Sequence, residues 1–345
     1  MIDRRAWRSL GSAATFVVVL SLAVLFGVML ASAPPPPGPS PASAVPAGQG
    51  SPPPYAVTPT PPGATAAAGS LPADVSGSST PLAPIPAFGH VFIVVMENRE
   101  YGSIIGNASA PYINSLATRY GLATGYTAVA HPSEPNYLAL WSGSTQGVTD
   151  DGRHDFTTGT TLADQVEASG RSWHVAAENV PPGCYLGSSA YGGADGDGWY
   201  ARKHEPAISW TSVSQDAARC ARITDFSHFD PNLGDLWLVV PNLCHDMHDC
   251  SIATGDAFLE RFLPTILDSP AFTDGVVFLT WDEGTSSIGG GGHVPLIAIS
   301  PLVKPGFDSS TPHSHYSLLR TIETAWGLPC LADACSASDL REVFR

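Results

Sequence analysis

The fold of this chain is organised around one stretch, which reads His131-Pro132-Ser133-Glu134-Pro135-Asn136-Tyr137. The apolar residues 123–130 before it predict a β-strand, and residues 137–141 predict the first turns of a helix. Ser133 would then lie at a helix N-terminus, where free backbone N–H groups and the helix dipole favour anions. The hydroxyl of Ser133 is therefore a candidate nucleophile at a phosphate site. The alternative is that Ser133 only caps the helix.

The overall charge limits the classes of partner. The formal net charge of -15 argues against nucleic acid and against electrostatic binding to anionic membranes. A protein of this charge that handles anionic substrates needs bound cations to correct the sign locally. No G-x-S-x-G motif surrounds Ser133, so an acyl hydrolase is not indicated.

Residues 1–33 have the pattern of an export segment. Arg4, Arg5 and Arg8 form a basic region, an uncharged apolar run follows at 13–30, and residues 31–33 resemble a cleavage site. Residues 42–44 are a second cleavage candidate. The apolar run is also nearly long enough to remain as an uncleaved membrane anchor. We expect a secreted or extracytoplasmic protein, with N-terminal anchoring as the alternative.

The next segment differs sharply in composition from the rest of the chain. Residues 34–86 are rich in Pro, Ala, Ser and Gly and almost free of charge, which predicts a disordered linker. Residues 87–345 lack an internal repeat or a second linker, which predicts one catalytic domain. We expect this domain to act as a monomer.

Within that domain, short apolar runs alternate with helical patterns. Continuous β-branched strands between helices predict an α/β three-layer sandwich, with a mostly parallel central sheet and helices on both faces. Besides the two elements flanking Ser133, we expect strands at 90–95, 172–177, 236–240, 276–281 and 294–300, and helices at 112–120, 161–168, 255–267 and 316–326.

All six cysteines follow the linker, and an even number in an exported protein indicates disulfides. The short-range choice among the possible pairings is Cys244–Cys250 with Cys330–Cys335, which leaves Cys184–Cys220. A C-x₂-C knuckle is absent from the sequence, so structural zinc held by cysteine is not indicated.

Polar residues follow the expected strands, at the sheet edge where ligands gather in α/β folds. They are Glu97 and Asn98, Ser133, the run from Asn242 to Asp249, and Asp282 and Glu283. His293, after four glycines, leads into the last expected strand. Oxygen ligands of this kind suit a hard divalent cation, and imidazoles such as those of His245 and His248 suit zinc, iron or manganese. A cation beside Ser133 would lower the pKa of its hydroxyl, so the set predicts hydrolysis at a phosphoryl centre.

The ordered motifs together resemble the bacterial phosphoesterase family, which contains secreted acid phosphatases and phospholipases C of the alkaline-phosphatase superfamily. The resemblance covers about residues 88–330 and rests on five blocks: 96–98, 133–136, 241–249, 280–284 and 292–295. It implies an alkaline-phosphatase-like fold, a Ser or Thr nucleophile that forms a phospho-enzyme, and one or two divalent metal ions.

The resemblance also assigns roles to individual residues. Ser133 matches the nucleophile, while Glu97 and Asn98 match the first metal and phosphate position, with Asn98 able to donate to phosphate. Asp282 and Glu283 match the paired metal ligands. Because zinc relatives carry His at the second of these positions, Glu283 favours a single oxygen-rich site.

The remaining assignments are less specific. We expect Asp246 and His248 as further metal ligands, with Asn242 and His245 as open alternatives, and His245 and His293 as phosphate contacts. The run from Lys203 to Pro206 resembles a Lys-His-x-Pro element of the acid phosphatases. His204 is expected to protonate the leaving oxygen or hold phosphate, the alternative being an ordinary loop histidine. His315 is expected to begin the last helix and pack near the site.

The sequence thus predicts an exported, metal-dependent phosphatase that hydrolyses phosphate monoesters through a phosphoserine at Ser133. The substrate would be a phosphorylated small molecule or a phospholipid head group. One alternative is a phospholipase C-like phosphodiesterase. Another is a surface-tethered member of the fold without catalysis, although the presence of Ser133, Glu97 and Asp282 argues against it.

Overall fold

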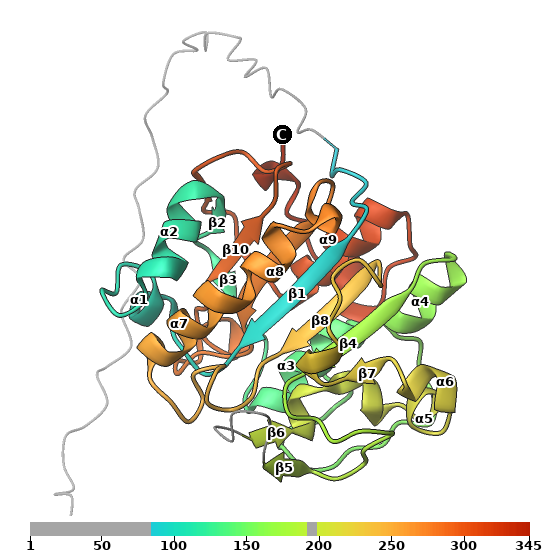
Figure 1. The fold of residues 1–345 in the computed structure, drawn as a ribbon. Coiled ribbons are helices and arrows are strands. Elements are labelled where there is room, and N and C mark those ends of the chain that lie inside the picture. Colours follow the sequence, from blue (N-terminus) through green and yellow to red (C-terminus); the bar gives the residue numbers. More distant parts are fainter. Residues whose placement is uncertain (1–83, 192–198) are drawn as a thin grey trace, which may run out of the picture. The chain divides into compact units, whose positions relative to one another are not determined.

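The computed structural model describes residues 84–191 and 199–345 (Figure 1). The predicted export segment, residues 1–33, and the predicted linker as far as residue 83 lie outside the described residues. Within the described ranges, none of the helices combines the length and apolar character needed to cross a membrane.

An eight-stranded sheet forms the centre, with the order β11-β2-β10-β9-β1-β8-β4-β7. Its strands are β1 (Val91–Met96), β2 (Gly121–Ala123), β4 (Trp173–Ala177), β7 (Ile223–Thr224), β8 (Leu236–Val240), β9 (Val276–Trp281), β10 (Leu296–Ile299) and β11 (Phe307–Ser309). Strand β10 runs antiparallel to both of its neighbours, and the other pairs are parallel. The predicted α/β class with a mostly parallel sheet is confirmed.

Helices and short turns connect the strands. The α-helices are α1 (Tyr101–Ile104), α2 (Pro111–Arg119), α3 (Ser133–Ser142), α4 (Leu162–Ala168), α5 (Thr211–Ser214), α6 (Ala217–Cys220), α7 (Ile252–Phe262), α8 (Pro264–Leu267) and α9 (His315–Trp326). The 3-10 turns are η1 (Arg202–His204), η2 (Pro206–Ser209), η3 (Phe226–His228), η4 (Pro270–Phe272), η5 (Ile288–Gly290), η6 (Ala332–Ser336) and η7 (Arg341–Val343). The predicted helix 255–267 divides into α7 and α8 because Pro264 lacks the N–H that would continue it.

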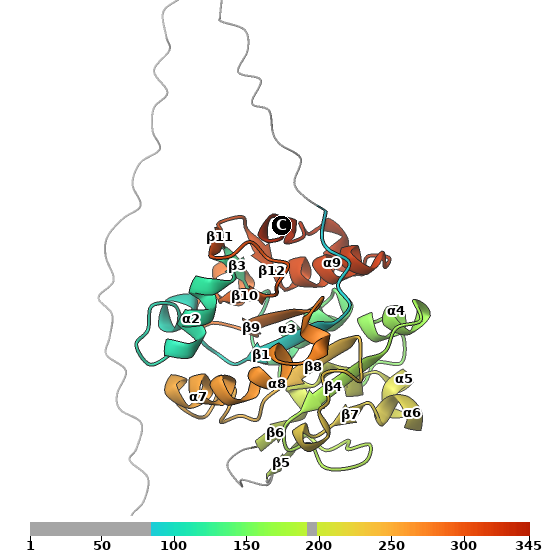
Figure 2. The ribbon, with the colours of Figure 1, turned by 45° about the horizontal axis from the view of Figure 1, so that its top comes forward.

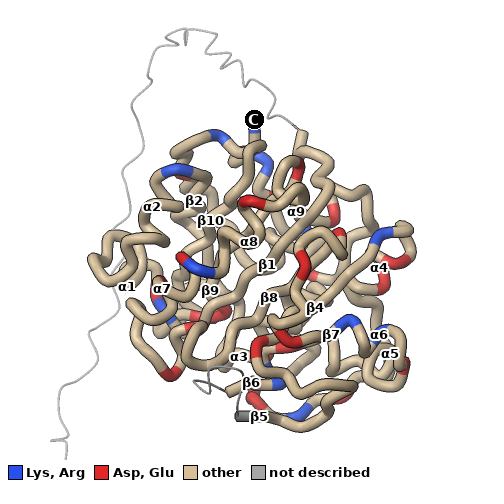
Figure 3. The backbone as a smooth tube through the Cα atoms, viewed as in Figure 1, with Lys and Arg blue, Asp and Glu red and all other residues tan. Residues whose placement is uncertain are grey.

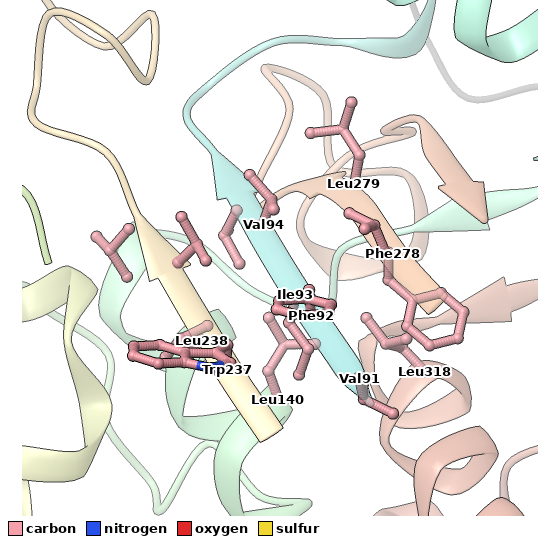
Figure 4. Packing of buried hydrophobic residues seen from close by; sticks show 14 of the residues in the cluster. Val91, Phe92, Ile93, Val94, Leu140, Trp237, Leu238, Phe278, Leu279 and Leu318 are labelled. Atoms are coloured by element: carbon pink, nitrogen blue, oxygen red, sulfur yellow. The ribbon is translucent and has the colours of Figure 1, made fainter. Parts of the chain in front are cut away.

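Helices cover both faces of the sheet, as predicted. Helix α3 packs against α9 on one face, and α2 packs against α7 on the other (Figure 2). Leu140 of α3 and Leu318 of α9 lie beside β1 in the core (Figure 4). Every residue of β1, β8 and β9 is buried, which is the expected state of central parallel strands covered on both faces.

The predicted strand 123–130 is wrong. Strand β2 ends at Ala123, and β3 (Tyr126–Thr127) pairs with β12 (His313–Ser314) in a separate small sheet. Residues 128–132 form a loop whose backbone bonds to Asn136. The amide of Asn136 accepts from the N–H groups of residues 129 and 130 and donates to the carbonyls of residues 130 and 132. These groups therefore need no neighbouring strand.

Three disulfides join Cys184 to Cys220, Cys244 to Cys250 and Cys330 to Cys335, and all three predicted pairs are confirmed. Disulfides persist in oxidising compartments, so they indicate an extracytoplasmic protein. The first includes Cys184, which precedes in sequence the antiparallel pair of β5 (Ser189–Tyr191) and β6 (Trp199–Ala201). The second closes the loop after β8.

Candidate active site

The carboxyl ends of three central strands meet at one edge of the sheet. The backbone N–H of Glu97, after β1, donates to the carbonyl of Asp246 at 2.9 Å. The N–H of Asp282, after β9, donates to the carbonyl of Met96 at 2.9 Å. Red segments, which mark Asp and Glu, lie near the α3, β9 and β7 labels of Figure 3. Neighbouring parallel strands therefore bring carboxylates from distant parts of the sequence together.

Asn98 turns the chain at the end of β1. Its φ of 52° lies in the left-handed region, which is uncommon for a residue other than glycine and often marks a functional position. In this conformation its backbone N–H donates to Oδ1 of Asp282 at 3.0 Å. Its side-chain amide donates to Oε2 of Glu97 at 2.8 Å. Asn98 thus fixes two carboxylates relative to each other.

Ser133 is the first residue of α3, and Pro132 occupies the N-cap position. Its side chain is buried, and Oγ lies 3.2 Å from Oε2 of Glu97 and 3.3 Å from Oε1 of Glu283. The hydroxyl therefore faces carboxylates instead of the N–H groups of its own helix. The alternative interpretation of Ser133 as a simple helix cap is wrong.

Glu97 is the carboxylate that contacts most of this set. Its Oε1 accepts a hydrogen bond from the hydroxyl of Tyr137 at 2.5 Å and lies 3.3 Å from Nε2 of His204. The ring of Tyr137 also stacks on that of His204, with 5.1 Å between centroids. Tyr137 was not predicted as a site residue. Its position four residues after Ser133 places both on one face of α3, which was the available signal.

His204 is brought into the cluster by η1. It is buried, and its Nδ1 lies 3.8 Å from Oδ2 of Asp246. Burial holds the pKa of His204 well below its ordinary value, and the positive charge of Lys203 lowers it further. The imidazole is therefore neutral, which is the form that binds metal ions. The Lys-His-x-Pro resemblance indicated this element, but His204 was expected to serve as an acid or a phosphate ligand and not as a metal ligand.

The donor set fits a cation. Glu97, His204 and Asp246 are buried, and each offers one atom within 4.8 Å of the others. Among the described residues, Oδ2 of Asp246 and Oδ2 of Asp282 are buried without a hydrogen-bond partner. Burial, followed by repulsion from Asp282 and Asp246, raises the pKa of Glu97 well above its usual range. Burial, followed by repulsion from Glu283, raises the pKa of Asp282 to about 7. Converging buried carboxylates of this kind favour occupation by a divalent ion.

His131 is a second residue that sequence reasoning missed as a site residue. Its Nε2 donates to the carbonyl of Ser286 at 2.9 Å, and its Nδ1 contacts Oε2 of Glu283. Since both ring nitrogens face oxygen, the pair of His131 and Glu283 shares a proton. The other oxygen of Glu283 accepts from Ser133, so this proton lies one carboxylate away from the candidate nucleophile.

Three predicted histidines have other partners. His245 contacts Glu178 through Nδ1 at 2.9 Å and stacks on Phe258. His293 donates from Nε2 to the carbonyl of Thr124 at 2.8 Å and stacks on Tyr101. These contacts support the surrounding loops and give no support to the phosphate-binding roles expected for them. His248 contacts Asp249, with its ring centroid 6.2 Å from that of His204.

Two further residues form hydrogen bonds to the backbone of loops that carry site residues. Asn242 accepts hydrogen bonds from the N–H groups of Cys244 and His245, so it shapes the loop. His315 begins α9 and is buried, with Nδ1 2.9 Å from the hydroxyl of Tyr126. Its Nε2 donates to the carbonyl of Asp282 at 2.6 Å, which places it near the site as expected. Burial lowers the pKa of His315 to about 4, so it is neutral.

The chain matches the model of the phosphoesterase family over residues 107–329. It is 36% identical over 267 residues to a phosphatidylinositol-3-phosphatase from Mycobacterium tuberculosis, covering 75% of this chain and 84% of that protein. It is 32% identical over 250 residues to a phosphate-repressible acid phosphatase from Penicillium chrysogenum, covering 67% of this chain but only 58% of that protein.

A solved structure of similar fold is the lipoteichoic acid synthase LtaP from Listeria monocytogenes. Its TM-score is 0.50 at 9% identity, with 75% of this chain and 80% of that chain covered. This match concerns the fold alone. Family and curated relatives agree with the predicted phosphoric ester hydrolase. The chain therefore belongs to the phosphoesterase family.

Proposed function

We propose that this protein is a metal-dependent phosphomonoesterase that forms a phosphoserine at Ser133. The observation that carries the proposal is the hydroxyl of Ser133 between Glu97 and Glu283, at the N-terminus of α3 and beside a cluster of buried carboxylates. A helix N-terminus favours the phosphoryl group, and the carboxylates accept the proton that the hydroxyl must lose.

The residues that would hold metal surround the same hydroxyl. Glu97, His204 and Asp246 form one group, and Asp282, Glu283 and Asn98 lie against it, which supports one or two ions. A bound divalent cation lowers the pKa of the hydroxyl and neutralises the phosphoryl oxygens. His248 lies beside His204 and remains a candidate for the outer part of this cluster.

The side chains of this protein then have defined tasks. Ser133 Oγ gives its proton to Glu97 or Glu283 and bonds to phosphorus, while the bond from phosphorus to the leaving oxygen breaks. The leaving oxygen lies in line on the far side of phosphorus and takes its proton from water, while the pair of His131 and Glu283 lies on the side of Ser133 and can take the proton of its hydroxyl. Water subsequently cleaves the phosphoserine. Asn98 donates to a phosphoryl oxygen without adding charge.

We further propose the substrate class. The relative from M. tuberculosis is named for hydrolysis of a phosphate monoester on an inositol lipid, and the fungal relative is named an acid phosphatase. Both names favour monoesters over diesters. A phosphorylated inositol head group is therefore the first lipid substrate to test, beside small soluble phosphate monoesters.

The organisation of the whole chain is part of the proposal. Residues 87–345 would form the catalytic domain, residues 34–86 a spacer, and residues 1–33 a signal peptide or an anchor. The three disulfides support folding after export.

The test is a panel of phosphate monoesters and diesters, run with and without chelator. A labelled monoester is also mixed with the protein, quenched in acid and mapped by peptide mass spectrometry. Label on Ser133 and preference for monoesters support the proposal. Faster diester hydrolysis would instead favour the phospholipase C-like alternative, and label on another residue would remove Ser133 from the mechanism.

A further inference from the structure

A lysine and an aspartate form an ion pair next to the first turn of α3 and remain outside the mechanism described above. Nζ of Lys203, in η1, donates to Oδ2 of Asp151 at 2.7 Å. Oδ1 of Asp151 accepts from the backbone N–H of Glu134 at 3.0 Å, and Glu134 directly follows Ser133. One carboxylate therefore joins the ammonium group of Lys203 to the first turn of the nucleophile helix.

The position of Lys203 in the chain brings it to the carboxylate cluster. The next residue, His204, lies 3.3 Å from Glu97. A salt bridge of 2.7 Å to Asp151 holds the ammonium group beside the first turn of α3. Lys203 therefore supplies a positive charge at the edge of the carboxylate cluster.

The ammonium group retains donors for a ligand. It has three N–H bonds, and Asp151 is its hydrogen-bond partner among the described residues. The side chain is 22% exposed, so the group is held by its surroundings yet open to solvent. Two arginines near the site are already bound elsewhere. Arg99 donates to the carbonyls of Met247 and Cys250, and Arg202 contacts Asp155.

We propose that Lys203 binds the phosphate group of the substrate and that Asp151 positions it for this contact. The inference rests on the proposed function, because it assigns the charged phosphate to the same site. The charged groups closest to Ser133 are the carboxylates of Glu97 and Glu283, which repel a phosphate dianion. A lysine acts as a point charge toward phosphate, and Asp151 fixes where that charge lies.

The first experiment compares Lys203→Met with Lys203→Arg and Asp151→Asn. Lys203→Met should raise KM for a monoester and Ki for inorganic phosphate about 10- to 100-fold, the range for one charge-assisted hydrogen bond. Lys203→Arg should recover part of this loss. Asp151→Asn should raise both constants less, because the cation remains. Lys304→Met is the control, since Lys304 donates to the Glu342 carbonyl and lies over Phe307.

The second experiment uses the wild-type protein and needs neither folding of a variant nor turnover. Lys203 and Lys304 are the only lysines in the sequence. Limited acetylation is followed by peptide mass spectrometry, with inorganic phosphate or with chloride at equal ionic strength. Phosphate should slow acetylation of Lys203 at least about fivefold, through occupation of the site, and leave Lys304 unchanged.

The outcomes separate the two proposals. Unchanged KM and Ki in Lys203→Met, or equal protection of both lysines, would overturn the role of Lys203 while the phosphatase proposal stands. Absence of turnover in the wild-type protein would overturn the proposed function. Protection of Lys203 by phosphate would still establish the anion site in that case.

Discussion

The hydroxyl of Ser133 donates to Oε2 of Glu97 across 3.2 Å, although 36 positions separate these residues in the sequence. The serine is carried by a helix and the glutamate by the end of a central strand. The same carboxylate also accepts hydrogen bonds from the hydroxyl of Tyr137 and the side-chain amide of Asn98, and it contacts His204. The side chain of Glu97 therefore connects helix α3, strand β1 and turn η1. Several of the predictions below depend on these contacts.

Replacing Ser133 by Ala should lower kcat by about three orders of magnitude or more, because no neighbour replaces a covalent step. Thermal stability and metal content should stay close to those of the wild-type protein. Ser142→Ala is the matched control, since its hydroxyl bonds to the carbonyls of Leu138 and Ser144 at the other end of α3. A Ser133→Ala protein with full activity per folded molecule would contradict the mechanism.

Replacing Tyr137 by Phe removes the hydroxyl that donates to Glu97 and keeps the ring that stacks on His204. A buried carboxylate then lacks a donor, so we expect a loss of about 1–3 kcal/mol in the free energy of unfolding. The kcat should fall about tenfold, because the proton affinity of Glu97 changes. Urea denaturation and steady-state kinetics measure the two effects. A variant with unchanged stability and kcat would show that the contact has no energetic role.

Chelation should abolish turnover, and added divalent ions should restore it, because the buried carboxylates and His204 fit a cation. Asp282→Asn should weaken metal binding, so excess metal should recover part of its activity. The same metal should recover nothing in Ser133→Ala. Calorimetric titration of the metal-free protein with Mg²⁺, Mn²⁺ and Zn²⁺ checks binding apart from catalysis. Full activity after exhaustive chelation would exclude metal dependence.

Glu342 should stabilise the fold in a pH-dependent way. Although burial opposes it, hydrogen bonds from His313 at 2.6 Å and Ser309 at 2.7 Å lower the pKa of Glu342 from 4.5 to about 2. A depressed pKa gives stability that is complete above pH 4.5 and is lost as the pH falls toward 2. Glu342→Gln should therefore cost about 2 kcal/mol at pH 7 and roughly half of that at pH 3.

Urea denaturation of both proteins at the two pH values checks this dependence. The relevant comparison is the difference between wild-type and variant at each pH, since many other carboxylates titrate in the same range. Because His313 lies two residues before His315, which supports Asp282, activity at pH 7 is a second readout. A pH-independent difference would assign the effect to packing instead of charge.

Much of the sheet could be predicted from the sequence because its central strands are continuous apolar runs. Strands β8 and β9 have the expected bounds, and β1 shifts by a single residue at each end. The ends of these strands also predict that Glu97 and Asp282 are neighbours, since parallel strands deliver their carboxyl ends to one edge. The disulfides could also be predicted from the sequence, because cysteines separated by few residues favour pairing with each other.

The parts that could not be predicted depend on side chains that meet across the fold. The pairing of His131 with Glu283 spans 152 positions, and that of Lys203 with Asp151 spans 52. No local pattern encodes such contacts. The strand prediction for the loop before Ser133 failed for a different reason. The apolar residues of this loop resemble a strand, but the side-chain amide of Asn136 supplies the hydrogen-bond partners that a neighbouring strand would otherwise provide.

The side-chain amide of Asn136 bears on how the catalytic centre forms during folding. Asn136 bonds to backbone groups only four to seven positions away, so the turn that presents the serine is encoded within a single short segment. Contacts of such small sequence separation close on the fastest timescales of chain motion, whereas partners 36 and 150 positions away require the long loops between them to be ordered first. The contacts of Asn136 that shape the serine turn are thus local in sequence, whereas the contacts that bring its acidic partners depend on the register of the parallel strands.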